Sequence, residues 1–248
     1  MESLPLKNKT ALVTGSARRI GAAIVTELHR LGADVVIHYR NSADAATELQ
    51  QQLNQLRTDS ASIVQADLQD ISTYGALIKA ATNGTGRLDI LVNNASSYYP
   101  TKIGDVDLAQ WDELMGSNAR APFFLAQQAA PLLKQSRGCI INMVDIHAFR
   151  PNKGYPVYSM AKAANAMMIK SLAQELAPEV QVNGVAPGAI LWPEETDGSY
   201  AEADIIDRIP LGRAGTPEDI AHTVAFLVQS PYITGQIIPV DGGRTIQQ

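Results

Sequence analysis

Short apolar runs that contain no polar residue are the most restrictive feature of this sequence. Ala11-Leu12-Val13 and Ile90-Leu91-Val92 show no alternation of polar and apolar positions. Such runs are typical of strands buried on both faces, as in a parallel sheet covered by helices. The predicted strands are Thr10–Thr14, Asp34–His38, Ser62–Ala66, Ile90–Val92, Cys139–Val144, Val180–Val185 and Ile237–Val240.

Segments with helical periodicity lie between these runs, among them Ile20–Leu31, Ala43–Leu56 and Thr73–Thr82. The repeated order of strand and helix implies right-handed crossovers. We therefore expect an α/β fold, a single-domain, doubly wound parallel sheet of the Rossmann type with helices on both faces. The domain should span 1–248, with a substrate loop around 187–208, because Pro187–Tyr200 is the one long irregular stretch.

Composition excludes several classes of protein. Of 248 residues, 46% are apolar and 18% are charged, a balance that can bury a large core. The net charge of −5 gives no basis for binding nucleic acid or an anionic membrane. Cys139 is the only cysteine, Met1–Thr10 is polar, and no run nears the ~18 apolar residues of a membrane span. Without an apolar signal or membrane span, we expect a cytoplasmic protein. No His, Asp or Glu cluster has metal-ligand spacing, so we expect no metal.

The first predicted strand leads into a glycine turn, Thr14-Gly15-Ser16-Ala17-Arg18-Arg19-Ile20-Gly21. A strand, a turn and a helix start in this order suit phosphate binding, because helix N–H groups and the helix dipole attract anions. Gly15 permits a tight turn and Gly21 permits close helix–strand packing, while Arg19 replaces the usual middle glycine. The alternatives are a purely structural turn and a solvated Arg18.

The second predicted strand ends at His38-Tyr39-Arg40-Asn41-Ser42, without the acidic residue that typically holds the ribose of NAD. Arg40 can pair with a 2′-phosphate, and Asn41 and Ser42 can donate hydrogen bonds to it. This pattern favours NADPH as the cofactor. The alternative is a solvated arginine at a strand end.

Polar residues also follow the third and fourth predicted strands. Asp67-Leu68 offers a carboxylate to an adenine amino group, although Asp67 could instead cap a turn. Asn93-Asn94-Ala95 can tie neighbouring strands together, and it can equally let the backbone approach the cofactor.

Tyr158 and Lys162 are four residues apart on a predicted helix and therefore share one face. A phenol is a poor acid or base near neutral pH, but a nearby ammonium stabilises the phenolate and lowers the phenol pKa. The pair can thus transfer a proton. A Tyr-x-x-x-Lys spacing alone also arises by chance and gains meaning from its context.

The glycine turn, Asn93-Asn94-Ala95, the Tyr158/Lys162 pair and Pro187-Gly188, in this order, resemble the short-chain dehydrogenase/reductase family. The resemblance runs from Thr10 to Gly243. It implies that Tyr158 donates the proton, that Lys162 tunes it and holds the nicotinamide ribose, and that Asn118 joins a proton relay. The C-terminal Tyr232-Ile233-Thr234-Gly235 and Val240-Asp241-Gly242-Gly243 resemble the end that builds a homotetramer in this family. The residues expected to bind the cofactor are Gly15, Arg18, Arg19, Ile20, His38, Tyr39, Arg40, Asn41, Ser42, Asp67, Leu68, Asn94, Ala95, Ser96, Tyr158, Lys162, Pro187 and Gly188.

Asp145 departs from the common family pattern, which has a serine there to hydrogen-bond a substrate carbonyl. An ionised carboxylate cannot donate a hydrogen bond, and it would repel a carbonyl oxygen that gains negative charge. Reduction of a ring C=N bond differs, because the ring nitrogen must receive a proton. Asp145 beside Tyr158 could relay that proton.

Three further residues, with Asp145, resemble the pteridine reductase branch of the family. Arg19 matches an arginine near the pyrophosphate and substrate, Ser96 a pterin-contacting serine, and Tyr98 an aromatic residue that sandwiches the pterin against the nicotinamide. The expected substrate is a pterin or folate, bound by Arg19, Ser96, Tyr98, Asp145, Tyr158, Leu191 and Trp192.

Other functions stay open at this point. Leu191-Trp192-Pro193-Glu194-Glu195 also resembles bacterial dihydromonapterin reductases, and the sequence does not separate the two activities. A reductase of 3-oxoacyl thioesters or other ketones would share this fold. A regulator that senses NADP(H) without chemistry is the third possibility, against which the intact Tyr158/Lys162 pair argues.

Overall fold

The computed structural model describes residues 4–82, 84–190 and 202–247. Seven parallel strands form one sheet in the order β3-β2-β1-β4-β5-β6-β7. This order confirms the expected doubly wound fold, in which the chain reverses its direction of winding between β1 and β4. The strands are β1 (Thr10–Val13), β2 (Asp34–Tyr39), β3 (Ala61–Gln65), β4 (Ile90–Asn93), β5 (Cys139–Met143), β6 (Gln181–Pro187) and β7 (Ile237–Val240).

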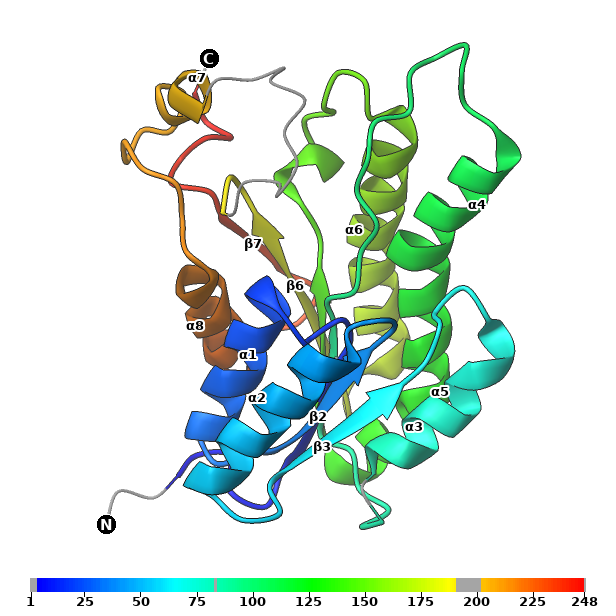
Figure 1. The fold of residues 1–248 in the computed structure, drawn as a ribbon, viewed down its shortest axis with the longest axis vertical. Coiled ribbons are helices and arrows are strands. Elements are labelled where there is room, and N and C mark those ends of the chain that lie inside the picture. Colours follow the sequence, from blue (N-terminus) through cyan, green and yellow to red (C-terminus); the bar gives the residue numbers. More distant parts are fainter. Residues whose placement is uncertain (1–3, 83, 191–201, 248) are drawn as a thin grey trace.

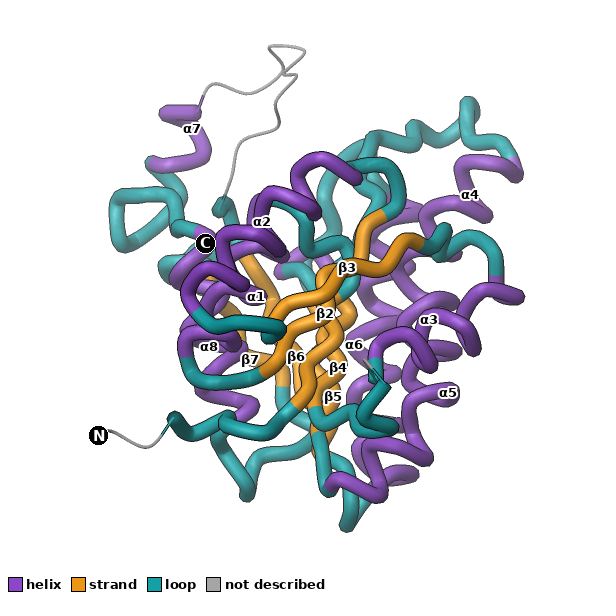
Figure 2. The backbone as a smooth tube through the Cα atoms, turned by 60° about the horizontal axis from the view of Figure 1, so that its bottom comes forward, coloured by secondary structure: helices purple, strands orange, loops and turns teal. Residues whose placement is uncertain are grey.

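Helices cover both faces of the sheet (Figures 1 and 2), with α1, α2 and α8 on one side and α3, α5 and α6 on the other. The α-helices are α1 (Arg19–Arg30), α2 (Ala43–Leu56), α3 (Tyr74–Ala81), α4 (Leu108–Met115), α5 (Ala121–Ser136), α6 (Pro156–Leu176), α7 (Glu202–Ile206) and α8 (Pro217–Val228). Two 3-10 turns, η1 (Ile71–Thr73) and η3 (Ile146–Ala148), and one π-helical segment, η2 (Gly116–Arg120), complete the regular structure of the described residues. None of the helices described could span a membrane.

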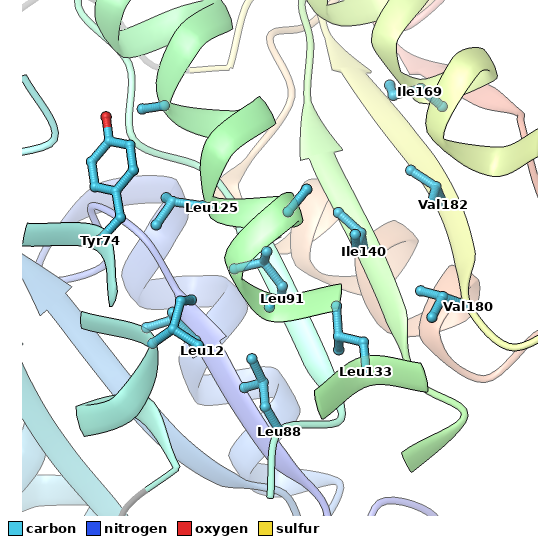
Figure 3. Close-up of a cluster of buried hydrophobic side chains, with 14 of the residues drawn as sticks. Leu12, Tyr74, Leu88, Leu91, Leu125, Leu133, Ile140, Ile169, Val180 and Val182 are labelled. Carbon is cyan, nitrogen blue, oxygen red and sulfur yellow. The ribbon is translucent and has the colours of Figure 1, made fainter. Parts of the chain in front are cut away.

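The core divides into two layers because successive side chains of a strand point to opposite faces. Leu12 and Leu91 pack under α3 and α5, as Figure 3 shows, whereas Val13 and Val92 pack under α1 and α8. All four side chains are fully buried. Burial on both faces is the reason why these runs contain no polar residue.

The predicted strands are all present, with ends shifted by at most two residues. The largest shift is in β6, which continues to Pro187 because Ala186 and Pro187 pair with Pro239 and Val240 of β7. Pro239 lies in an edge strand of the sheet, where its missing N–H costs no ladder bond. The parallel strands all end at one edge, so the residues after β1, β4, β5 and β6 meet there.

Candidate active site

The glycine turn after β1 lies directly against the end of β4. Gly15 has a φ of +60°, and a Cβ there would lie 2.9 Å from the Ala95 Cα. A Cβ on Gly21 would lie 2.5 Å from the Gly15 carbonyl oxygen. Arg19 also has a positive φ, +55°, at the position of the missing middle glycine. The backbone therefore keeps the glycine-type turn, and the turn leads into the N-terminus of α1.

Thr14 and Asn94 hold this turn in place. The Asn94 side-chain amide donates to the carbonyl oxygens of Thr14 and Gly15, each at 2.9 Å. The Thr14 hydroxyl accepts from the backbone N–H groups of Asn94 and Ala95 at 2.9 and 3.0 Å. Of the two roles open for Asn94 in the sequence, its side chain performs the structural one.

His38 also supports the turn, and its side chain does not face the site as expected for a nucleotide contact. Its Nδ1 accepts from the Gly15 N–H at 2.9 Å, so its Nε2 carries the proton toward the Ala66 carbonyl at 3.2 Å. Burial lowers the pKa of His38 to about 4, which keeps the ring neutral. Both ring nitrogens are thus occupied by the protein itself.

The other predicted nucleotide residues lie at the ends of β2 and β3. Arg40 and Asn41 are exposed, and Ser42 directly precedes α2. Asp67 is exposed as well and accepts from the Gln69 N–H at 2.9 Å, which is the turn-capping role, while Leu68 is buried. An exposed guanidinium at this strand end can reach a phosphate group.

Helix α6 presents Tyr158 and Lys162 on one buried face, as their spacing predicts. The Tyr158 hydroxyl donates to Asp145 Oδ2 at 2.8 Å, and the Lys162 ammonium donates to the Met143 carbonyl at 2.9 Å. The Lys162 Nζ lies 5.6 Å from the centre of the Tyr158 ring. Asp145 follows β5 and accepts from the His147 N–H at 2.8 Å, which holds its carboxylate toward the phenol.

The electrostatics differ from the expectation that Lys162 lowers the Tyr158 pKa. Burial raises the pKa of Tyr158 well above its ordinary value, and the carboxylate of Asp145 raises it further. Burial lowers the pKa of Lys162 to about 8, and the negative charge of Asp145 opposes this shift. The expectation was wrong for the protein alone, because burial raises the Tyr158 pKa most and the hydrogen-bonded carboxylate of Asp145 adds to that rise. Tyr158 is consequently a protonated donor.

The π-helical segment η2 brings Asn118 to the same site. The Ser96 hydroxyl donates to Asn118 Oδ1 at 2.6 Å and also helps to lower the Tyr158 pKa slightly. The Asn118 carbonyl accepts from Asn165 at 2.9 Å, and Asn165 in turn accepts from Asn142 at 2.9 Å. Asn118 was expected from the sequence, whereas Asn142 and Asn165 were missed, because isolated asparagines on separate elements carry no local pattern.

Tyr98 lies beside Tyr158. Its ring makes an edge contact with Tyr158, with centroids 4.8 Å apart, and stacks on Tyr155 at 4.7 Å. Tyr155 was not predicted, although it stands one turn before Tyr158 at the start of α6. Tyr98 remains 47% exposed, so one ring face is covered by Tyr155 while much of the ring is accessible.

Pro187 and Gly188 end β6 at the same edge of the sheet. A Cβ on Gly188 would lie 2.7 Å from the Asp241 Cα, so this position needs glycine for the close approach of the C-terminal segment. The predicted substrate residues Leu191 and Trp192 lie outside the described residues.

This arrangement is shared with known proteins. A solved structure titled as a mutant of a Serratia marcescens short-chain dehydrogenase/reductase superposes with a TM-score of 0.91 at 33% identity, covering 97% of this chain and 99% of that one. A family profile described as Enoyl-(Acyl carrier protein) reductase matches residues 15–245. The chain belongs to the short-chain dehydrogenase/reductase family.

Two curated relatives differ in their named activities. This short-chain reductase is 39% identical to Pteridine reductase 1 of Leishmania tarentolae, over 95% of this chain and 96% of that protein. It is 37% identical to the 3-oxoacyl-[acyl-carrier-protein] reductase FabG of Staphylococcus aureus, over 95% and 97%. Both relatives are reductases, and the two identities do not separate their substrates.

The described residues of this short-chain reductase fit the nicotinamide cofactor that reductases of its family use. The turn at Gly15 leaves the N-terminus of α1 open, with Arg18 and Arg19 exposed beside it. A pyrophosphate can bind there to backbone N–H groups. Lys162 lies on α6 beside Tyr158, where its charge can hold a ribose hydroxyl.

We expect Lys162→Met to abolish turnover of this short-chain reductase yet to stabilise the fold near neutral pH. The folded-state pKa of about 8 lies below the ordinary 10.5, so charging the buried amine costs stability fully below pH 8, and the cost fades as pH rises toward 10.5. The gain in unfolding free energy should be about 1–3 kcal/mol at pH 7, after loss of the Met143 hydrogen bond.

Urea unfolding at pH 7 and pH 10 measures this effect. Lys170→Met removes an exposed lysine from the same helix and serves as the control. A Lys162→Met protein less stable than wild type at pH 7, or a difference that does not shrink at pH 10, would contradict the expected cost.

Proposed function

We propose that the chain is a cytoplasmic, NADPH-dependent pteridine reductase that folds as a single domain. The observation that carries this proposal is the 2.8 Å hydrogen bond from the Tyr158 phenol to Asp145. A carboxylate occupies the place where a ketone reductase needs a neutral donor. The similarity to Pteridine reductase 1 supports the same substrate class.

The charge of Asp145 distinguishes a ketone from a ring C=N bond. A reduced ketone develops negative charge on oxygen, which an ionised carboxylate destabilises. A reduced ring carbon receives hydride while its neighbouring nitrogen takes a proton, so the nitrogen needs an acid. NADPH held by the turn at Gly15 and by Lys162 would supply the hydride. Tyr158 and Asp145 share one proton, and Lys162 supplies positive charge to the same buried region.

A flat heterocycle also suits the surroundings of Tyr158. The accessible part of the Tyr98 ring can stack on a planar substrate, as aromatic rings prefer. Ser96 lies beside it with a hydroxyl already oriented by Asn118, and Arg19 is exposed at the start of α1. These side chains can contact one ring system from two parts of the chain, the segment after β4 and the start of α1.

A substrate panel tests the proposal directly. The enzyme is mixed with NADPH or NADH and with one of four substrates: dihydrobiopterin, dihydromonapterin, dihydrofolate or a 3-oxoacyl thioester. Oxidation of the cofactor is followed by the fall in its absorbance. We expect turnover of at least one pterin with NADPH. Good turnover of the thioester with no pterin binding or turnover would instead support a 3-oxoacyl reductase, which the similarity to FabG favours.

Asp145→Ser removes the carboxylate that is hydrogen-bonded to the Tyr158 phenol. A serine hydroxyl can still accept from the His147 N–H, so the turn should stay intact. We expect pterin turnover to fall by about 100-fold or more, the usual contribution of a positioned acid. NADPH affinity, measured by fluorescence titration, should not change. An unaltered pterin rate would show that the carboxylate takes no part.

Arg40 is the proposed reader of the NADPH 2′-phosphate. We expect Arg40→Glu to lower kcat/KM for NADPH by about 10- to 100-fold, because charge-assisted hydrogen bonds contribute about 1.5–3 kcal/mol. The value for NADH should change little. Lys79→Glu makes the same charge change at an exposed position on α3 and is the control. An equal loss with both cofactors would contradict this role.

We also propose a homotetramer. Phe123, Met160 and Met167 form an exposed apolar face on α5 and α6, and Tyr232 and Ile246 near the C-terminus are exposed as well. Exposed apolar groups gathered in this way are typical of assembly surfaces.

Light scattering should give about four chain masses for the wild type, and Met167→Glu should reduce the mass. Leu56→Glu changes an exposed leucine on α2 and should leave the mass as it is. A wild-type mass of one chain would refute assembly.

A further inference from the structure

The segment Ser96–Pro100 follows β4 without regular secondary structure, yet its side chains alternate as in a strand. Ser96 and Tyr98 point toward the catalytic residues, where they contact Asn118 and Tyr158. Ser97 and Tyr99 point the other way, toward α4. The segment has no ladder partner, so something else must fix which side chains face the site.

Glu113 of α4 bonds both outward-facing side chains. Its Oε1 accepts from the Ser97 hydroxyl at 3.0 Å, and its Oε2 accepts from the Tyr99 hydroxyl at 3.1 Å. An ionised carboxylate only accepts, so both hydroxyls must donate to it. Burial and the Glu113 carboxylate raise the pKa of Tyr99 to about 12, which keeps its hydroxyl protonated. The carboxylate therefore bridges the two neighbours of Tyr98.

The backbone of the segment has further ties to the same helical region. The Ser97 N–H donates to the Ser117 hydroxyl at 3.3 Å, and the Ser97 carbonyl accepts from Asn118 at 3.0 Å. These bonds hold the segment at Ser97. Beyond Tyr98, the Tyr99 hydroxyl donates to Glu113 and faces the Gln110 carbonyl at 3.2 Å, and the Tyr99 ring packs beside Leu114 and Val157. The Thr101 N–H donates to the Gly154 carbonyl at 2.7 Å. Among these contacts, Glu113 is the side chain that bonds the residues on both sides of Tyr98.

We propose that Glu113 is a positioning residue that sets the register of Ser96–Pro100 and thereby holds the Tyr98 ring over the substrate position. A slip by one residue would turn Tyr98 toward α4 and bring Tyr99 toward the site. The part of this inference that concerns the substrate rests on the proposed function, in which the fixed Tyr98 ring selects flat heterocycles. The register itself is independent of what the enzyme reduces.

The kinetic test compares Glu113→Ala and Glu113→Gln with Asp112→Ala. Asp112 is the neighbouring exposed carboxylate of α4, so its variant makes the same charge change without touching the segment. With the best pterin of the panel, we expect Glu113→Ala to raise KM about tenfold, the scale of a small misplacement of a contact group. The rate at saturation and the NADPH affinity should change less than about twofold, and Glu113→Gln should lie in between. A KM equal to that of wild type would overturn the proposal.

Hydrogen–deuterium exchange tests the register without any substrate. Amides of residues 96–99 and 101 should exchange faster in Glu113→Ala than in wild type or Asp112→Ala, while those of β4 should not change. The double variant Ser97→Ala/Tyr99→Phe should reproduce this pattern, and adding Glu113→Ala to it should have no further effect. Unchanged exchange in Glu113→Ala would reject the inference even if pterins are substrates. Faster exchange in a protein that turns over no pterin would instead refute only the proposed function.

Discussion

The burial of a parallel sheet on both faces is the constraint on which the rest of this molecule depends. Parallel strands connected by helices must all end at one edge, so the polar residues that follow β1, β4, β5 and β6 gather there. The close approach of Gly15 to Ala95, and of Gly188 to the Asp241 backbone, then makes this edge compact. The side chains of the candidate site are positioned by the same geometry.

Within that edge, buried charge decides the chemistry. Lys162 is held almost without solvent, where its ammonium is destabilised, and Asp145 places a negative charge against the Tyr158 phenol. Burial and the negative charge of Asp145 together raise the pKa of the Tyr158 phenol and keep it protonated. A ketone reductase with a neutral hydroxyl at position 145 would lack this arrangement.

Much of the site is held by side chains that do not face it. The π-helical segment η2 projects Asn118 inward, and Asn165 bonds its carbonyl from α6. Helix α4 contributes Glu113, which bonds the hydroxyls on either side of Tyr98. A π-helical segment is costly to form and is often found at functional sites. Here it buries Ala119 while Asn118 bonds Ser96 in the candidate site.

The sequence by itself determined the order of strands and helices, the glycine turn and the shared face of Tyr158 and Lys162. These features follow from local periodicity and from spacing along one helix, so few residues suffice to read them. It also singled out Asp145 and Tyr98, which the structure places within contact of Tyr158.

Only the tertiary structure decided which groups share a proton or a hydrogen bond across elements. It turned His38 inward to hold the Gly15 N–H, stacked Tyr155 on Tyr98, and raised rather than lowered the Tyr158 pKa. Each outcome depends on the distance between residues that are remote along the chain, and on how deeply packing buries them. Hydrogen bonds and pKa values respond to those distances, which no local pattern contains.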